Sequence, residues 1–160
     1  MDRFIMNPIG VIHTPFETLE GMPIQPVGAG KTMGQVAVDP QYAEGLADIE
    51  GFSHLILIYA FHQSKGFQLK VKPFLDDHVR GLFATRAPRR PNPIGLSIVK
   101  LLQREGNILH VSHIDVVDGT PLLDIKPYVP AFDSPDATAI GWLDGKVEDS
   151  RRMRSDERFK

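Results

Sequence analysis

The chain has 160 residues, a formal net charge of −2 and no cysteine. The missing cysteines exclude disulfides and thiolate metal sites, and the near-neutral charge excludes a general attraction to nucleic acid, which would need local basic patches. No stretch approaches the ~20 apolar residues of a membrane span, and the start of the chain lacks the apolar run of a signal peptide, so we expect a cytoplasmic protein.

Short strands are predicted along most of the chain, because thirteen prolines and fourteen glycines interrupt it. Residues 53–62 are almost continuously apolar, which predicts a strand buried on both faces. One helix is predicted over residues 40–50, with Asp39 as its cap, Pro40 in its first turn and Gly51 at its end. The predicted strands are 8–13, 34–38, 53–62, 69–74, 80–87, 96–102, 107–116 and 122–128.

This pattern indicates a mainly β protein, a barrel or a sandwich with one or two short helices. No glycine-rich GxGxxG loop opens a helix, so a dinucleotide fold is not supported. The proline-rich loop 15–33 is long for a compact domain, which is typical of functional or mobile loops. Beyond residue 133 the apolar pattern fades, although Ile140, Trp142 and Leu143 are expected to dock on the body. We therefore predict a barrel domain over 1–135 and a partly basic C-terminal extension over 136–160.

The segment FATRAPRRPNPIGLS, residues 83–97, is the most unusual of the sequence. Its prolines at 88, 91 and 93 fix backbone dihedrals and stiffen the loop, and a stiff loop loses less entropy when it binds a ligand. Its arginines suit carboxylates and phosphates. A surface crossover between two strands is the alternative that composition leaves open.

A second candidate segment, residues 113–128, holds three aspartates, Asp115, Asp118 and Asp124. Asp118 with Gly119 is also an ordinary turn pair, and Asp124, which lies among apolar residues, would need a partner such as Lys126 or Arg86. The six histidines show no metal-ligand spacing, and Asp76-Asp77-His78 is only a weak candidate. We therefore predict no metal site and no Ser/His/Asp nucleophile.

Four stretches closely resemble the TsaA-like family, also called TrmO: NPIGVIHTPF, GFSHLILIYAFHQS, FATRAPRRPNPIGLS and DVVDGTPLLDIKPYVPAFD. The resemblance spans residues 5–133. It implies a small β-barrel and an S-adenosylmethionine-dependent methyltransferase that acts on N6-threonylcarbamoyladenosine next to the anticodon of tRNA. It also implies a homodimer with the cofactor near the subunit interface. A cofactor- or RNA-binding barrel without catalysis, or a methyltransferase with another substrate, remains as the alternative.

The resemblance also implies which residues bind the cofactor. Ile24 replaces an arginine of the family pattern, which weakens a polar role at this position. The positions that match the family's cofactor segments are Pro23, Ile24, Gln25, His62, Gln63, Arg86, Leu96, Asp115, Val116, Val117 and Asp118.

Methyl transfer needs orientation and a shielded pocket, and the proton on N6 must leave. We expect Asp118 or Asp124 to take that proton. Arg86, Arg89 and Arg90 are expected to hold the cofactor carboxylate or an RNA phosphate, and Phe83 or Tyr128 to stack on the target base. We also expect a pocket shared between two chains, with the loop 15–33 lying across the neighbouring subunit.

Overall fold

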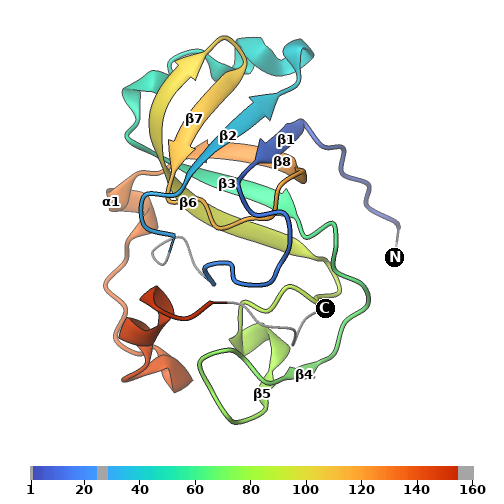
Figure 1. The fold of residues 1–160 in the computed structure, drawn as a ribbon, viewed down its shortest axis with the longest axis vertical. Helices are drawn as coiled ribbons and strands as arrows, with labels where there is room; N and C mark the ends of the chain where they lie inside the picture. Colours follow the sequence, from blue (N-terminus) through green and yellow to red (C-terminus); the bar gives the residue numbers. More distant parts are fainter. Residues whose placement is uncertain (1, 25–28, 155–160) are drawn as a thin grey trace.

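Six strands close into a barrel (Figure 1). The computed structural model describes residues 2–24 and 29–154 of the chain. The strands follow one another around the barrel in the order β1-β2-β7-β6-β3-β8, and every neighbouring pair is antiparallel. The expected mainly β barrel is therefore confirmed. The strand bounds are β1 Gly10–His13, β2 Met33–Val38, β3 His54–Ala60, β6 Ile94–Glu105, β7 Ile108–Ser112 and β8 Thr120–Pro127.

Side chains alternate between the barrel interior and its outer surface. In β3, Leu55, Leu57 and Tyr59 are buried, whereas Ile56 and Ile58 are half-buried. The prediction that this strand is buried on both faces is wrong, because a closed barrel encloses only one face of each strand. The inward residues form the core: Ile12, Val36, Val38, Leu46, Leu55, Leu57, Tyr59, Val99, Leu109, Val111, Ile114, Val116 and Leu122.

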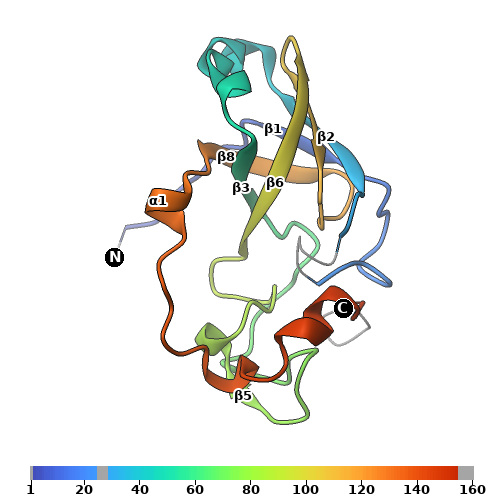
Figure 2. The same cartoon turned by 90° about the vertical axis from the view of Figure 1, so that its left-hand side faces the viewer.

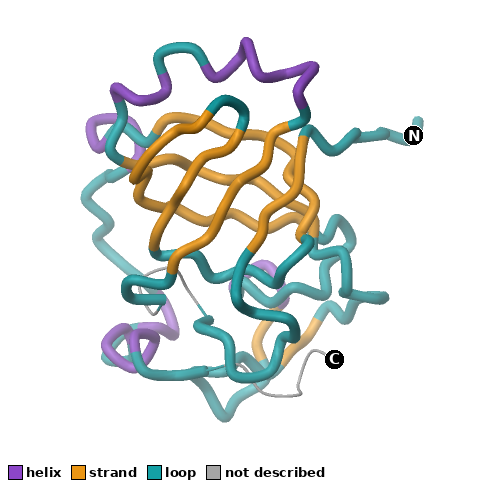
Figure 3. Tube along the Cα trace, turned by 45° about the horizontal axis from the view of Figure 1, so that its top comes forward, coloured by secondary structure: helices purple, strands orange, loops and turns teal. Residues whose placement is uncertain are grey.

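The connection from β2 to β3 closes one end of the barrel (Figure 3). The predicted α-helix over 40–50 is instead two 3-10 helices, η2 Pro40–Leu46 and η3 Ile49–Gly51. They are separate because Asp48 has a left-handed backbone, with φ of 67°, which interrupts any continuous helix. Asp39 makes no side-chain capping bond, so that prediction is also wrong, whereas η3 ends at Gly51 as expected.

A second, smaller lobe lies beyond the other end of the barrel (Figure 2). Its strands β4 Lys70–Val71 and β5 Arg80–Gly81 pair with each other and lead into the 3-10 helix η4 Leu82–Ala84. The strands predicted over 69–74 and 80–87 are therefore much shorter, because Pro73 lacks the N–H of a ladder and η4 turns the chain. The lobe packs around Val71, Leu82 and Ala87, with Phe74 against them.

The C-terminal segment crosses from the barrel to this lobe (Figure 1). It contains a short helix, α1 Pro130–Asp133, and two 3-10 helices, η5 Gly141–Leu143 and η6 Val147–Arg151. Trp142 docks as expected, since its Nε1 donates a hydrogen bond of 2.7 Å to the Ala84 carbonyl, while Ile140 stays 46% exposed. Within residues 2–24 and 29–154, no helix has the length and apolar character needed to cross a membrane.

Candidate functional site

One end of the barrel gathers the segments that the sequence singled out. Because neighbouring strands are antiparallel, β1, β3 and β7 end there and β2, β6 and β8 begin there. The loops that follow β1, β3 and β7 leave from this end, opposite the helices η2 and η3 (Figure 1). We call it the loop end of the barrel.

A chain of three polar side chains runs inside the loop end. Tyr59 Oη lies 2.9 Å from Ser97 Oγ, and Ser97 Oγ donates a hydrogen bond of 2.6 Å to Asp115 Oδ1. Tyr59 is 4% exposed and Ser97 is fully buried, whereas Asp115 is recessed but still reaches solvent. Burial raises the pKa of the Tyr59 hydroxyl, with the Asp115 charge adding to the effect, so the phenol stays neutral. These hydrogen bonds therefore join the core to a carboxylate that reaches solvent.

Asp115 has an environment suited to a proton acceptor. Burial raises the pKa of its carboxyl to about 6, although the Ser97 hydrogen bond and the Arg86 charge pull the pKa down. A carboxyl of this kind is ionised at neutral pH yet more basic than an ordinary aspartate. Strongly shifted groups in recesses are frequent in active sites.

The loop after β7 is pinned to the chain that follows β1. The predicted strand over 107–116 ends at Ser112, because His113 turns the backbone with φ of 63°. Thr14 Oγ1 then donates to the Val116 carbonyl at 2.7 Å, and the Asp118 N–H donates to the Phe16 carbonyl at 2.7 Å. These bonds fix residues 113–119 at the loop end.

Asp118 serves as an acceptor in this junction. Its Oδ1 accepts a hydrogen bond of 3.1 Å from the Thr14 N–H and lies 3.2 Å from His13 Nδ1. The Thr14 hydrogen bond, with that of His13, holds the pKa of the Asp118 carboxyl below its usual value. A carboxylate with a lowered pKa is a weaker base, so Asp118 is better suited to holding the loop than to accepting a proton.

The arginines of the stiff loop have different surroundings. Arg90 Nη1 donates to the carbonyls of Thr85 and Ala87 at 3.0 and 3.1 Å, and its guanidinium lies 5.7 Å from the Phe83 ring centre. Arg90 therefore shapes its own loop, and its expected contact with a ligand stays a prediction. Arg86 is exposed, and its charge acts on Asp115 and Tyr59.

The remaining residues expected to bind the cofactor differ in their exposure. His62 and Gln63 are exposed just beyond β3, where the Phe61 N–H donates to the Pro93 carbonyl at 2.7 Å and ties them to the stiff loop. Val116 and Val117 have buried side chains, so only their backbone is available to a ligand.

Leu96 points outward from β6 and is 54% exposed, on the opposite side of the strand from Ser97. Pro23 is buried, Ile24 is half-buried, and Gln25 lies outside the described residues. The described part of the loop after β1 packs on its own chain, with Met22 5% exposed and Pro23 bridged to Arg154. Whether the loop also reaches a neighbouring subunit stays a prediction.

Two other candidates lie away from the loop end. Asp124 sits on the outer face of β8, where it pairs with Lys126 at 2.8 Å and has a 45% exposed side chain, so the expected partner is confirmed but the carboxylate is not deeply buried. Tyr128 follows β8 at the opposite end of the barrel, edge-on to His54 with ring centres 6.2 Å apart. Phe83, in contrast, is 74% exposed in the stiff loop.

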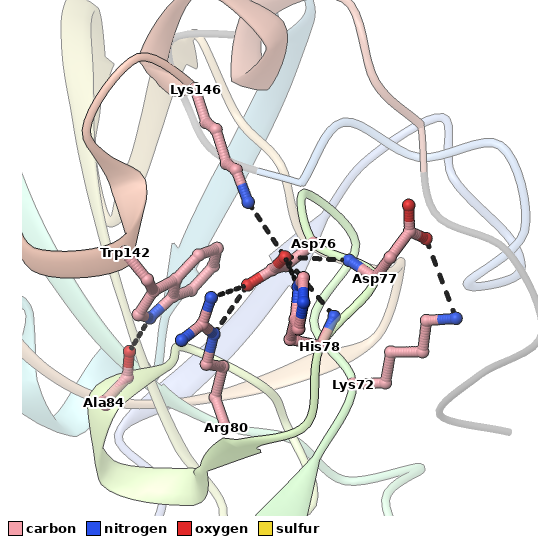
Figure 4. A network of polar contacts seen from close by, with 8 residues as sticks. All are labelled: Lys72, Asp76, Asp77, His78, Arg80, Ala84, Trp142 and Lys146. Carbon is pink, nitrogen blue, oxygen red and sulfur yellow. Dashed lines mark hydrogen bonds and ion pairs between the residues drawn. The ribbon is translucent and has the colours of Figure 1, made fainter.

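A separate polar cluster joins the small lobe to the C-terminal segment (Figure 4). The Asp76 side chain is 2% exposed and accepts hydrogen bonds from Arg80 at 2.6 Å and Lys146 at 2.8 Å, with His78 Nδ1 at 3.1 Å. Lys146 and Arg80 also each lie 5.8 Å from the Trp142 ring centre. Across the described ranges, no three His, Asp or Glu side chains form a group able to hold a metal ion, so the weak candidate at Asp76-Asp77-His78 is an ion-pair cluster.

Sequence reasoning missed Tyr59 and Ser97 as parts of the site. Within residues 96–99, Leu96 and Ile98 face outward while Ser97 and Val99 face inward. A serine at an inward position of an alternating strand is a detectable signal, because a buried hydroxyl needs a partner.

Comparison with known proteins gives consistent matches. Residues 11–134 match the family model described as the tRNA-methyltransferase O N-terminal domain. A probable S-adenosyl-L-methionine-binding protein of Pyrococcus abyssi is 53% identical over 153 residues, which are 96% of this chain and 83% of that protein. The tRNA (adenine(37)-N6)-methyltransferase of Escherichia coli is 39% identical over 150 residues, which cover 87% of this chain and 64% of that protein.

The crystal structure of TrmO from Pseudomonas aeruginosa is also similar, with a TM-score of 0.74 and 37% identity. The match covers 88% of this chain and 63% of that one. The chain thus spans just under two thirds of the length of the Escherichia coli and Pseudomonas aeruginosa proteins.

Proposed function

This chain belongs to the tRNA-methyltransferase O N-terminal domain family, and from this premise we propose that it transfers a methyl group from S-adenosylmethionine to N6 of adenosine 37 in tRNA. The observation that carries the proposal is the group of residues at the loop end. There the Arg86 charge acts on the Asp115 carboxylate, and hydrogen bonds fix the loop 113–119. The arrangement supplies a base, a cation and a rigid backbone without metal ligands.

The donor set at the loop end fits S-adenosylmethionine. Arg86 would pair with the cofactor carboxylate, because a guanidinium binds a carboxylate through two parallel hydrogen bonds. The backbone of residues 115–118 offers polar groups to the ribose and adenine, and Asp118 fixes that backbone through Thr14. When bound, the cofactor supplies an activated methyl group on a sulfonium. The residues proposed to hold it are Pro23, Ile24, Gln25, His62, Gln63, Arg86, Leu96 and Asp115 to Asp118.

The proposed substrate carries a threonylcarbamoyl group on N6. This group adds a carboxylate to the base, and the exposed Arg86 and the nearby Arg89 offer cations for it. The carbonyl next to N6 also makes its single N–H more acidic, so a carboxylate base suffices. Phe83, 74% exposed in the same loop, offers a ring on which the purine can stack.

We propose that the active form is a homodimer that completes the pocket. The outer faces of β3 and β6 pair aliphatic side chains, and the helices η2 and η3 sit at the barrel end rather than over this face (Figure 3). Leu96 lies on this outer face. Asp115, in contrast, bonds to Ser97, which faces the inner side of the same strand. This arrangement supports a pocket to which two chains contribute, with Leu96 from one chain and Asp115 from the other. The outward pairs are Ile56 with Ile98, Ile58 with Leu96 and Ala60 with Ile94.

Two organisational features belong to the same proposal. The barrel domain over 1–135 carries the transfer site, and the extension over 136–160 braces the small lobe through Trp142 and Lys146. We also propose a cytoplasmic location, which the proposed tRNA substrate supports.

Calorimetry and a transfer assay together test the proposed function. The protein is titrated with S-adenosylmethionine in excess chelator, and then incubated with methyl-labelled cofactor and tRNA. We expect saturable binding and label in the RNA. Binding without transfer would leave a cofactor-binding barrel, and undetectable binding at millimolar cofactor would refute the proposal.

A further inference from the structure

The hydroxyl of Tyr59 is held in one place by its neighbours. A Cβ added at Gly95 would lie 2.2 Å from the Tyr59 ring, so the ring rests directly on the backbone of β6. Phe61 packs edge-on against it, with ring centres 5.5 Å apart and planes at 85°. Close packing on both sides holds the ring in the rotamer that directs its hydroxyl at Ser97.

The direction of the hydrogen bonds follows from the number of protons. Ser97 has one hydroxyl proton and donates it to Asp115 Oδ1. Its oxygen must then accept from Tyr59, whose phenol stays protonated because burial raises its pKa. The two donors point one way, toward the carboxylate, and stabilise its charged form.

The Asp115 carboxylate keeps acceptor capacity for a ligand, because its two oxygens carry about four lone-pair sites. Oδ1 accepts from Ser97, the backbone N–H of Asp115 also bonds this carboxyl, and the residue as a whole still reaches solvent. The titratable or charged groups that act on this carboxyl are Tyr59 from β3 and Arg86 from the stiff loop, with the Ser97 hydroxyl from β6 between them. Asp118, three residues further on, is occupied by His13 and Thr14.

On this geometry, and resting on the proposed function, we propose that Asp115 is the general base of the methyl transfer and that Ser97 and Tyr59 are its positioning residues. The adenine N6 attacks the methyl carbon of a sulfonium donor. A bond forms between N6 and that carbon while the bond from carbon to sulfur breaks, and its electron pair stays on sulfur as a neutral thioether. The N6 proton passes to the Asp115 carboxylate. Arg86 restrains the basicity of this carboxylate and keeps it ionised at neutral pH.

The test compares Asp115→Asn, Ser97→Ala and Tyr59→Phe with wild type, with Asp77→Asn as a control because its side chain is 96% exposed in the small lobe. The carboxyl groups are titrated by NMR in the protein without cofactor. We expect one resonance with a midpoint near pH 6 that is missing in Asp115→Asn. Ser97→Ala should raise that midpoint by about one pH unit, since it removes a hydrogen bond to the charged form, and Tyr59→Phe should raise it less.

Single-turnover rates and cofactor affinities complete the test. We expect the wild-type rate to rise with pH up to a plateau above about pH 6. At saturating cofactor, Asp115→Asn should lose about 100-fold in rate, and the pH dependence with it. Equal rates in Asp115→Asn and wild type would overturn the inference, as would a loss of cofactor binding with an unchanged rate at saturation. If the midpoint of the Asp115 titration is the same in Ser97→Ala as in wild type, the positioning role of Ser97 is refuted. No transfer by wild type would instead refute the proposed function itself.

Discussion

Ser97 donates a 2.6 Å hydrogen bond from the barrel interior to Asp115, whose carboxyl lies in a loop 18 residues further along the chain. The carboxyl is recessed enough for its pKa to rise to about 6, so folding favours its neutral form. Its contribution to stability is full below the unfolded pKa, near 4, and is lost as pH rises through 6.

We therefore predict that Asp115→Asn stabilises the protein. At pH 8 the free energy of unfolding should rise by about 1–3 kcal/mol, because the neutral amide avoids burial of a charge. At pH 4 the gain should shrink to near zero. Urea unfolding at both pH values measures it, and destabilisation at pH 8 would mean that the charge of Asp115 is needed for the fold.

Gly95→Ala should disturb the hydrogen bonds of Tyr59, Ser97 and Asp115 by displacing the Tyr59 ring. The added Cβ meets the Tyr59 ring at 2.2 Å, so the ring must move away from Ser97, and we expect a loss of about 1–3 kcal/mol. Thermal unfolding measures it against Gly81→Ala, where nothing lies within 4 Å and φ is −62°. Equal melting temperatures for the two variants would contradict the prediction, because they would show that the Tyr59 ring can move aside without loss of stability.

The Asp76 cluster should make the contact between the small lobe and the C-terminal segment sensitive to acid. Hydrogen bonds from Lys146 and then Arg80 hold the pKa of the Asp76 carboxyl well below its usual range. The stability it contributes is therefore present above about pH 4 and is lost as pH falls through the folded-state pKa. Asp76→Asn should lower the melting temperature at pH 7 and speed proteolysis within 134–154.

The matched control for this prediction is Asp77→Asn, whose 96% exposed carboxylate lies 3.7 Å from Lys72. It should behave as wild type, because exposed ion pairs contribute little. Proteolysis of Asp76→Asn at the wild-type rate would show that Trp142 alone holds the segment.

Arg86→Ala should weaken binding while the fold survives. The side chain is exposed, and the loss of a charge-assisted contact should cost about 1.5–3 kcal/mol in cofactor or RNA affinity. Calorimetry measures the affinity for the cofactor, and filter binding measures the affinity for RNA. Unchanged affinity for both ligands would leave Arg86 as a surface charge that acts only on Asp115.

Mixing two inactive variants tests the shared pocket. Arg86→Ala and Leu96→Ala dimers are each expected to lose transfer. If the two residues serve one pocket from different chains, half of the dimers in an equal mixture are mixed and each has one intact site, so about a quarter of the wild-type activity returns.

Two results would contradict the shared pocket. Mixing restores nothing if both residues serve the pocket of their own chain. Light scattering that gives a monomer with full activity would exclude the dimer altogether.

The barrel could be predicted from the sequence because proline and glycine spacing and apolar alternation are local signals. The strand ends could not: Asp48 and His113 adopt left-handed backbones that non-glycine residues rarely take, and only the surrounding fold stabilises them. The η2 and η3 helices and the early end of β7 follow from these two residues.

Only those residues of the site that lie in recognisable sequence motifs could be predicted. The resemblance pointed to Arg86 and Asp115, but it gave no pairing with Tyr59 and Ser97, because those contacts join positions 38 and 18 residues apart. Asp124 looked buried because its neighbours in sequence are apolar. It lies on the outer face of β8, next to Lys126, because a register shift between β3 and β8 turns the strand there.

The central claim is tested most directly by locating the methyl group. tRNA from a strain that lacks this modification is incubated with the purified protein and methyl-labelled S-adenosylmethionine, digested, and analysed by mass spectrometry of nucleosides and fragments. We predict one methyl group on N6 of adenosine 37, on the threonylcarbamoyl form, and almost none with Asp115→Asn. Label at another position, or none with active wild-type protein that binds the cofactor, would contradict it.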